Sequence, residues 1–211
     1  MNKLLLLTLI IIVGLTGCSD PDKPSISLHL AIEREDINQI ERHIFWDSDL
    51  DKPDINGQAP LHVAASNGGY IVVKLLVEKG ADINARDQEG LTPLDRAALK
   101  GRTQVMEYLV GQGAEHDPNR LLERVVRSGV TTRDIIPALQ RIGADPDHRN
   151  EQGETPLSIA IANGNRVLVK NLIKNGADVN LATTDGTSPL DLAREQGDPD
   201  IIQMLRLNGA Q

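Results

Sequence analysis

Two ladders of short motifs recur along this chain at regular intervals. A proline followed by a leucine stands at positions 60, 93, 156 and 189, so the first and last intervals are equal. Gly-Ala pairs begin at positions 80, 113, 143, 176 and 209, at equal intervals except for 113–143, which is three residues shorter. The two ladders are independent of each other and agree. Regular motifs at this distance indicate supersecondary units stacked in a row rather than one globular core.

The unit is clearest in residues 56–87. It has an apolar run that opens with Ala-Pro-Leu-His, a break at 66–68, a second apolar run over 70–77, and a closing Gly-Ala-Asp. The spacing of three and four between apolar residues in the second run predicts a helix. We therefore expect two short helices and then an extended, turn-rich finger. Helices of this length are not stable alone, so each must pack against the neighbouring unit.

The residues before each first helix predict how that helix begins. The segments 92–95 and 188–191 have the pattern of a complete capping box, in which the hydroxyl accepts an amide and the carboxylate reaches back. The segment 155–158 predicts the cap but only half of the box. Proline follows each of these caps at the first helical position, where its missing N–H costs nothing.

These motifs resemble those of ankyrin-repeat proteins, and the resemblance covers roughly residues 24 to 211. It implies an all-α solenoid of stacked helix-turn-helix units with extended finger loops. We expect the ankyrin-repeat domain at 26–211. Its six repeats are expected at about 24–56, 57–89, 90–117, 118–149, 150–182 and 183–211.

The fourth unit departs from the pattern. It has no Pro-Leu opening, is three residues shorter, and carries Pro137 inside its second apolar run. We expect it to lack the capping box of its first helix, a loss of about 0.5–2 kcal/mol per missing cap, and to be the weakest layer. If Thr132 caps the second helix, Pro137 lies in a helix interior, which costs ~3 kcal/mol. We favour a later start that places Pro137 in the first turn, because Ile135, Ile136 and Leu139 still supply an apolar face.

The first 18 residues differ from the repeats. Lys3 precedes an apolar run over 4–13, which is too short for a membrane-spanning helix and fits the core of a signal peptide. Leu15-Thr-Gly-Cys18 then resembles the lipobox of bacterial lipoproteins, whose signal peptide is cut before the cysteine. The resemblance implies a signal peptide at 1–17, acylation (for example by palmitate) at Cys18 and a lipidated tether at 18–25. A plain secretory signal cleaved nearby and an uncleaved anchor are the alternatives.

The predicted lipid on Cys18 implies a bacterial envelope protein. Cys18 is the only cysteine, so its acylation would leave no thiol for a disulfide or a metal. In lipoproteins of this kind an aspartate after the cysteine favours retention in the inner membrane. Ser19 stands at that position, which favours the outer membrane, with the repeats facing the periplasm.

The composition argues against several function classes. The formal net charge of −8, without a basic stripe, disfavours nucleic acid as a partner. The chain has no G-x-S-x-G, no H-E-x-x-H, no glycine-rich phosphate loop and no Cys-His pair, so we expect no enzyme, no catalytic residue and no cofactor. The acidic segments 145–148 and 49–54 lack the ligand spacing of a calcium loop, so we expect no metal site.

The histidines of the first two repeats and the aromatic pair of the first repeat can be explained by their places in the repeat. His29 and His62 occupy the histidine position of the family's Thr-Pro-Leu-His motif, which implies a bond within their own repeat, weakened here because the threonine is missing. Phe45 and Trp46 near the end of the first repeat either cover the apolar edge of the terminal cap or anchor a partner.

Ankyrin-repeat proteins usually contact partners through the finger tips and the exposed ends of the first helices. The matching positions form a mostly polar to acidic set, and the alternative is that they are simply solvated. We predict that a protein partner contacts Ile55, Asn56, Gln58, Ser66, Asn67, Gln88, Glu89, Leu91, Leu99, Lys100, Glu151, Gln152, Glu154 and Asn163, and in the last repeat Asp185, Thr187, Glu195 and Gln196.

The sequence thus predicts a monomeric, lipid-anchored adaptor or modulator of an envelope or periplasmic protein. An immunity-type inhibitor of a toxin or hydrolase is the alternative. An enzyme is a third class, which the missing catalytic constellation disfavours.

Overall fold

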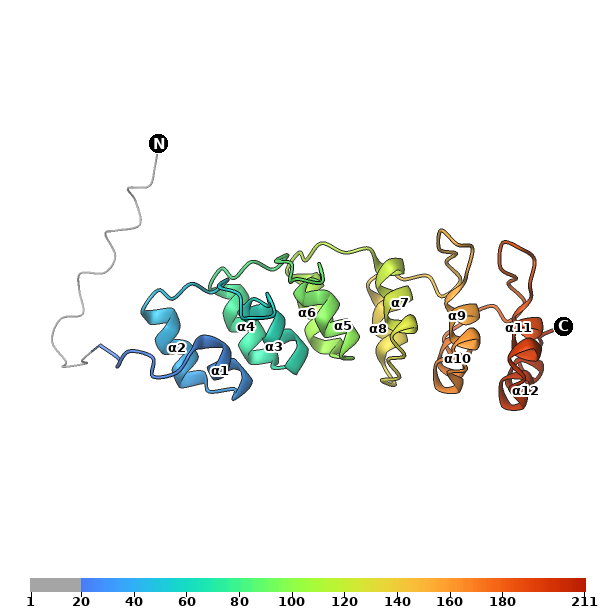
Figure 1. The fold of residues 1–211 in the computed structure, drawn as a ribbon, viewed down its shortest axis with the longest axis horizontal. Helices are drawn as coiled ribbons and strands as arrows, with labels where there is room; N and C mark the ends of the chain where they lie inside the picture. The colour runs from blue at the N-terminus through green and yellow to red at the C-terminus, as the bar shows by residue number, and fades with distance from the viewer. Residues whose placement is uncertain (1–19) are drawn as a thin grey trace, which may run out of the picture.

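The computed structural model describes residues 20–211, and within this range twelve helices form six pairs stacked in one row (Figure 1). The first helices of the pairs are α1 (Leu28–Glu33), α3 (Pro60–Asn67), α5 (Pro93–Leu99), α7 (Pro118–Arg127), α9 (Pro156–Ala162) and α11 (Pro189–Gln196). The second helices are α2 (Ile37–Phe45), α4 (Tyr70–Glu78), α6 (Thr103–Gly111), α8 (Ile135–Arg141), α10 (Arg166–Lys174) and α12 (Pro199–Leu207). The described residues contain no strand, and the predicted all-α solenoid is confirmed.

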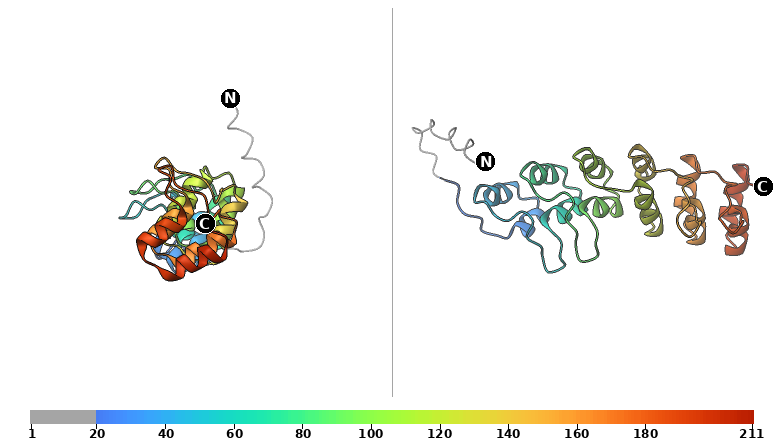
Figure 2. Two further views of the ribbon diagram at one scale, coloured as in Figure 1. Left: turned by 90° about the vertical axis from the view of Figure 1, so that its right-hand side faces the viewer. Right: turned by 90° about the horizontal axis from the view of Figure 1, so that it is seen from above.

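One aliphatic core runs through the whole stack. First helices pack on the first helices of neighbouring pairs, and second helices pack both on their own partners and on neighbouring second helices. Buried leucine, isoleucine, valine and alanine side chains form one continuous cluster from Leu28 to Leu205. Seen end on, the pairs lie over one another (Figure 2, left). Each layer therefore depends on its neighbours for burial, as expected of a solenoid.

The helix caps agree with the sequence in one case and differ in two. In α5 the predicted box is complete: the Asp95 amide donates to the Thr92 hydroxyl (3.2 Å), and the Thr92 amide donates to the Asp95 carboxylate (3.0 Å). The half box predicted for α9 is wrong, because the Ser158 hydroxyl accepts the Thr155 amide (2.9 Å) and closes the box.

The complete box predicted for α11 is also wrong. The Asp191 amide donates to the Ser188 hydroxyl (3.1 Å), as predicted. The Asp191 carboxylate, however, accepts the Ser188 hydroxyl proton (2.7 Å) and pairs with Arg194 (2.8 Å), so only half of the box is in place. At the other end, Gly197 ends the helix in the left-handed region (φ +70°).

The fourth helix pair is better capped than predicted. Asp117 accepts the amides of residues 119 (3.0 Å) and 120 (3.1 Å), so α7 has a side-chain cap and the expected loss of a cap is wrong, although the capping box itself is absent as expected. The late start of α8 is confirmed, because the helix begins at Ile135 and Pro137 is its third residue. Asp134, not Thr132, stands at the N-cap position.

The main irregularity of the stack lies between the third and fourth pairs. Four of the five connections between pairs are equally long, at 46–59, 79–92, 142–155 and 175–188, but the connection 112–117 is less than half their length. The longer connections project from the stack as hairpins, seen clearly before α9 and α11 in Figure 1 and before α3 and α5 in Figure 2 (right). We call these four loops fingers 1, 2, 4 and 5. Finger 3 is missing.

Candidate partner-binding face

The fingers owe their shape to a repeated side-chain turn. In finger 2, Asp87 Oδ1 accepts the backbone amides of Glu89 (2.9 Å) and Leu91 (3.0 Å). Asp54 in finger 1 and Asn150 in finger 4 accept the corresponding amides, two and four residues further on, at 2.8–3.0 Å. Short polar side chains commonly form turns of this kind. The tips of fingers 1, 2 and 4 are therefore held in defined positions.

Finger 2 is also tied to its helix by a buried ion pair. The Asp87 side chain is fully buried and accepts a hydrogen bond from Arg96 Nε (2.7 Å), and Arg96 Nη2 forms an ion pair with the same carboxylate (2.6 Å). The same guanidinium reaches the exposed Glu89 carboxylate (3.0 Å). Burial by itself raises the pKa of Asp87, but the bonds from Arg96 and from the Leu91 and Glu89 amides outweigh burial and lower the pKa below its ordinary value.

Histidine side chains join fingers 1 and 2 to the helices that precede them. His29 Nε2 lies 2.9 Å from the Gln58 carbonyl oxygen. His62 accepts the Ala59 amide at Nδ1 (3.2 Å), which leaves Nε2 to donate to the Leu91 carbonyl (2.9 Å). The prediction that both histidines bond within their own repeat is thus wrong for His29 and incomplete for His62. Their main bond reaches the next finger, because the motif histidine faces the carbonyl that precedes the next first helix.

A second ladder of hydrogen bonds joins successive layers near the finger bases. In each case a side-chain oxygen accepts a backbone amide of the next layer, at 2.8–3.1 Å. The pairs are Asp51 with the amide of 82, Asn84 with 115, Asn119 with 145, Asp147 with 178, and Asn180 with 211. Where finger 3 is missing, Asn119 in the first turn of α7 takes the place of a finger residue. The ladder is therefore continuous across the irregular layer.

Most of the predicted partner contacts lie on the surface. Ile55 at the tip of finger 1 is 95% exposed, and the other exposed positions are Asn56, Asn67, Gln88, Glu89, Lys100, Glu151, Gln152, Asn163, Asp185, Glu195 and Gln196. Half-buried positions are Gln58, Ser66, Leu99, Glu154 and Thr187. The prediction that Leu91 contacts a partner is wrong. This residue is only 8% exposed and its carbonyl is bound by His62, so it belongs to the core.

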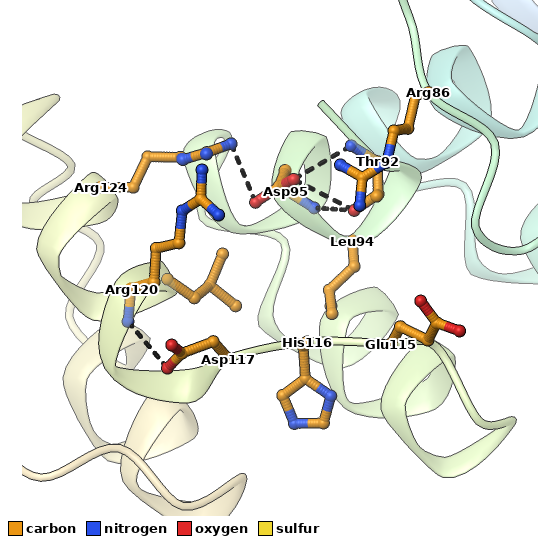
Figure 3. A pocket seen from close by; sticks show the side chains of 10 residues that line it. Arg86, Thr92, Leu94, Asp95, Glu115, His116, Asp117, Arg120 and Arg124 are labelled. Atoms are coloured by element: carbon orange, nitrogen blue, oxygen red, sulfur yellow. Dashed lines mark hydrogen bonds and ion pairs between the residues drawn. The ribbon is translucent and has the colours of Figure 1, made fainter. Parts of the chain in front are cut away.

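The missing finger leaves a cavity that sequence reasoning did not find. We call it the notch. It has a volume of about 90 Å³ and lies between the end of finger 2 and the first turns of α7 (Figure 3). Its lining includes Arg86, Leu94, Asp95, His116, Arg120 and Arg124.

Charged groups in the notch are unevenly paired. Arg124 Nη1 lies 3.1 Å from Asp95 Oδ1, but at an angle that makes no hydrogen bond, and this buried nitrogen has no acceptor among residues 20–211. Arg86 donates to the carbonyl oxygen of Gly90 (3.0 Å). The Arg120 guanidinium makes no ion pair and no hydrogen bond within the described range.

The aromatic pair at the N-terminal end is partly covered by the chain itself. Phe45 and Trp46 are 54% and 39% exposed and meet edge to face, with ring centroids 5.5 Å apart. Trp46 Nε1 donates to the Pro21 carbonyl (3.0 Å), and Lys23 Nζ lies 5.4 Å from the ring centroid. These contacts favour the first interpretation, in which the rings cover the edge of the terminal repeat.

In the range 20–211, no group of three His, Cys, Asp or Glu side chains is placed to hold a metal ion. None of the helices described there is long and apolar enough to cross a membrane.

Stacked helix pairs with projecting fingers define a repeat scaffold of the ankyrin type. The chain belongs to the ankyrin-repeat family, since the family model described as "Ankyrin repeats (3 copies)" matches residues 28–120 and 122–211. Ankyrin repeats bind protein partners, and proteins built from them are generally non-catalytic interaction scaffolds.

Solved structures agree with this assignment. The ankyrin repeat domain of Bcl-3, a member of the IkappaB protein family, has a TM-score of 0.71 and 26% identity, over 92% of this chain and 89% of that chain. An ankyrin repeat domain from Acinetobacter baumannii has a TM-score of 0.64 and 31% identity, over 87% and 98%. A chain in the complex of a predatory endopeptidase from Bdellovibrio bacteriovorus with an immunity protein has a TM-score of 0.67 and 26% identity, over 88% and 99%. No curated protein sequence matches significantly.

Proposed function

We propose that this chain is a lipid-anchored, non-enzymatic adaptor or modulator that binds an envelope or periplasmic protein through its finger face. The finger face consists of the four finger tips and the adjoining ends of the first helices. The observation that carries the proposal is the repeated side-chain turn at Asp54, Asp87 and Asn150, which holds exposed tips in defined positions. Presenting a rigid surface lowers the entropy cost of binding a partner.

The anchor belongs to the same proposal. The anchor comprises a signal peptide at 1–17, acylation at Cys18 and a tether at 18–25. It attaches the monomeric repeat domain, residues 26–211, to the outer membrane, and the domain faces the periplasm. Cys18 and the lipobox lie outside the described residues, and their support is the sequence pattern. Pro21 and Lys23 contact Trp46, so the chain after the proposed anchor is held against the first repeat.

Replacing the cysteine tests the anchor. Cys18→Ala is expected to leave the precursor uncleaved and unlabelled by a fatty-acid probe, because the thiol is the acceptor of the lipid. Processing would be followed by mass and labelling by gel fluorescence, with Ser19→Ala as the control that keeps the thiol. Normal cleavage and labelling of Cys18→Ala would rule out lipidation at this residue.

Charge reversal tests the finger face. Glu151 is exposed at the tip of finger 4 and makes no ion pair within residues 20–211, whereas Glu89 pairs with Arg96 at 3.0 Å. Reversing both together (Glu89→Lys with Glu151→Lys) is expected to weaken partner capture by about tenfold, since each exposed charge contributes about 0.2–1 kcal/mol. Capture would be measured by pull-down of the tagged chain from solubilised envelopes, with helix content checked by circular dichroism.

The matched control is Glu41→Lys, an exposed reversal on the second helix α2. It is expected to leave capture unchanged. If capture survives the double reversal, or falls equally with Glu41→Lys, the partner uses another face.

An immunity-type inhibitor of a toxin or hydrolase is the second candidate. It is favoured by the match to the complex that contains an immunity protein, in which 99% of the matched chain is covered. The two candidates differ in what the captured partner does. A hydrolase whose activity is blocked by stoichiometric addition of this chain would establish the second candidate, and a partner without such activity would favour the first.

A further inference from the structure

We propose that the notch binds a carboxylate side chain carried by a loop of the partner protein. This inference rests on the proposed function as a protein binder and names one contact within it. The occupant is a protein loop bearing an aspartate or glutamate, which enters the gap between finger 2 and finger 4.

The notch exists because a finger that would fill it is absent. In the second layer, His62 donates to the Leu91 carbonyl of finger 2. Asp95 is the third residue of its first helix, as His62 is of the preceding one, so it occupies the same place in the next layer. The short connection 112–117 brings no finger over it, and Arg124 from α7 approaches instead (3.1 Å). Charged side chains therefore line a space that backbone fills elsewhere in the stack.

The guanidinium groups outnumber the acceptors available to them. Arg120 and Arg124 are four residues apart on α7, which places them on one face, where like charges repel. Figure 3 shows both side chains extending toward Asp95, the carboxylate that Arg124 contacts. Arg120 has no acceptor in the described range, and neither has the buried Nη1 of Arg124. Two cations thus face one carboxylate, and a second carboxylate would satisfy both.

The other acids near the notch do not fill this role. Asp117 caps α7 through its Oδ1, which accepts the amides of residues 119 and 120, and it makes no ion pair with the arginines of the notch within residues 20–211. Glu115 lies on the opposite side of the cavity, and Figure 3 shows its carboxylate directed away from Arg120 and Arg124. Neither acid therefore pairs with Arg120 or Arg124, whose one ion pair in the notch is the contact of Arg124 with Asp95.

The volume of the notch and the charge of its side chains determine which chemical group it can bind. A cavity of about 90 Å³ holds one side-chain head group and is too small for a helix. Guanidinium groups bind carboxylates with two parallel hydrogen bonds, which makes such pairs both strong and directional. The net charge of −8 and the acidic finger tips repel a polyanion such as nucleic acid. A single carboxylate on an otherwise uncharged or basic loop meets no such barrier.

A short peptide tests the notch without the partner. The full chain, purified in detergent with isotope-labelled arginine side chains, is titrated at low salt with a blocked Gly-Glu-Gly tripeptide and with the matching Gly-Gln-Gly tripeptide. We expect saturable shifts of the Arg120 and Arg124 Nε–H signals with the glutamate peptide only. Arg120→Gln is expected to weaken this binding about tenfold, the effect of losing one strong charge-assisted hydrogen bond.

Arg206→Gln is the matched control. Arg206 is exposed on α12 and makes no ion pair among residues 20–211, so its loss should leave the titration unchanged. An equal response to both peptides, an unsaturable response shared by all arginines, or unchanged binding by folded Arg120→Gln would overturn the proposal. Any of these results would leave the finger-face proposal intact, whereas a failed charge-reversal test at Glu89 and Glu151 would leave the notch intact.

Discussion

Replacing Asp87 with alanine is expected to lower the free energy of unfolding by about 3–5 kcal/mol, the usual cost of breaking a buried ion pair by removing one partner. The Asp87 side chain is fully buried and accepts three hydrogen bonds, one from Arg96 Nε and two from backbone amides of finger 2, and it forms an ion pair with Arg96. Its loss would leave a mostly buried guanidinium facing a cavity and remove the turn that holds the finger tip. Chemical denaturation of the full chain measures the change.

Asp87→Asn separates the two roles of this side chain. Asn150 forms the same turn in finger 4, so an amide can hold the finger, but it cannot form the ion pair with Arg96. We expect a clearly smaller loss of stability than with alanine. Equal losses for the two variants would show that the turn contributes little and that the ion pair alone matters.

Asp87 also contributes a pH dependence to the stability of the chain. Its pKa is lowered in the folded chain, so the folded state favours the ionised carboxylate. The resulting stabilisation is fully present above the ordinary aspartate pKa and is lost as the pH falls below that value and through the lowered one. Stability curves should show a loss in acid that is smaller in Asp87→Asn. The same acid loss in both proteins would assign it to other carboxylates.

Amide hydrogen exchange is expected to be faster in residues 118–142 than in 60–110, by about tenfold or more, because the weakest layer of a solenoid opens first. Helix α7 packs less extensively on α5 than α5 packs on α3. The α7–α8 connection spans seven residues (128–134), and α8 has seven residues where α4, α6 and α10 have nine. The missing finger removes further contacts from this layer.

Two features of the same layer stabilise it against opening. Leu122 and Ile136 are fully buried, and α7 is capped by Asp117, so the layer has an intact core and one good helix start. The expected difference is therefore in local opening rather than in global unfolding. Uniform protection across the stack would show that core burial outweighs the weaker packing of α7, and the fourth layer would then not be the weak one.

The fold could be predicted from the sequence because motif spacing, apolar periodicity and capping residues all indicate the same repeats. Proline after a hydroxyl residue predicts the first helices, and α5 and α9 begin there as predicted. The two errors in capping arise because a capping box depends on where one side chain turns. Ser158 turns back to the backbone, while Asp191 turns to the Ser188 hydroxyl and Arg194. Residue type alone does not decide between these positions.

The sequence did not reveal the missing finger, because the short connection is partly offset by longer segments in the same repeat. Counting from one Gly-Ala pair to the next reveals only a net loss of three residues. The structure divides this into a connection eight residues shorter than the other fingers, a ten-residue α7 and a longer α7–α8 connection. A sharper signal was present in the sequence: a polar residue followed three positions later by glycine occurs at 54–57, 87–90, 150–153 and 183–186, and not within 112–117.

The exposure of the predicted contact residues follows from the repeat pattern at most positions, but not where the chain turns inward. Ile55, Gln88 and Glu151 lie at finger tips as the pattern implies. Leu91 was wrongly placed among the contacts, because the last residue but one before a first helix folds into the core and offers its carbonyl to His62. The notch could not be assigned from residue types, since it is made by the absence of a loop.

Site-specific photo-crosslinking tests the central claim, that the finger face binds a protein, most directly. A photoreactive residue would replace Gln88 on finger 2 or Gln152 on finger 4, with Gln203 on the second helix α12 as the exposed control. Irradiated envelopes should contain one discrete adduct of higher mass for positions 88 and 152 and none for position 203. Adducts from position 203 alone, or none from any position in a chain that is folded and expressed, would contradict the account.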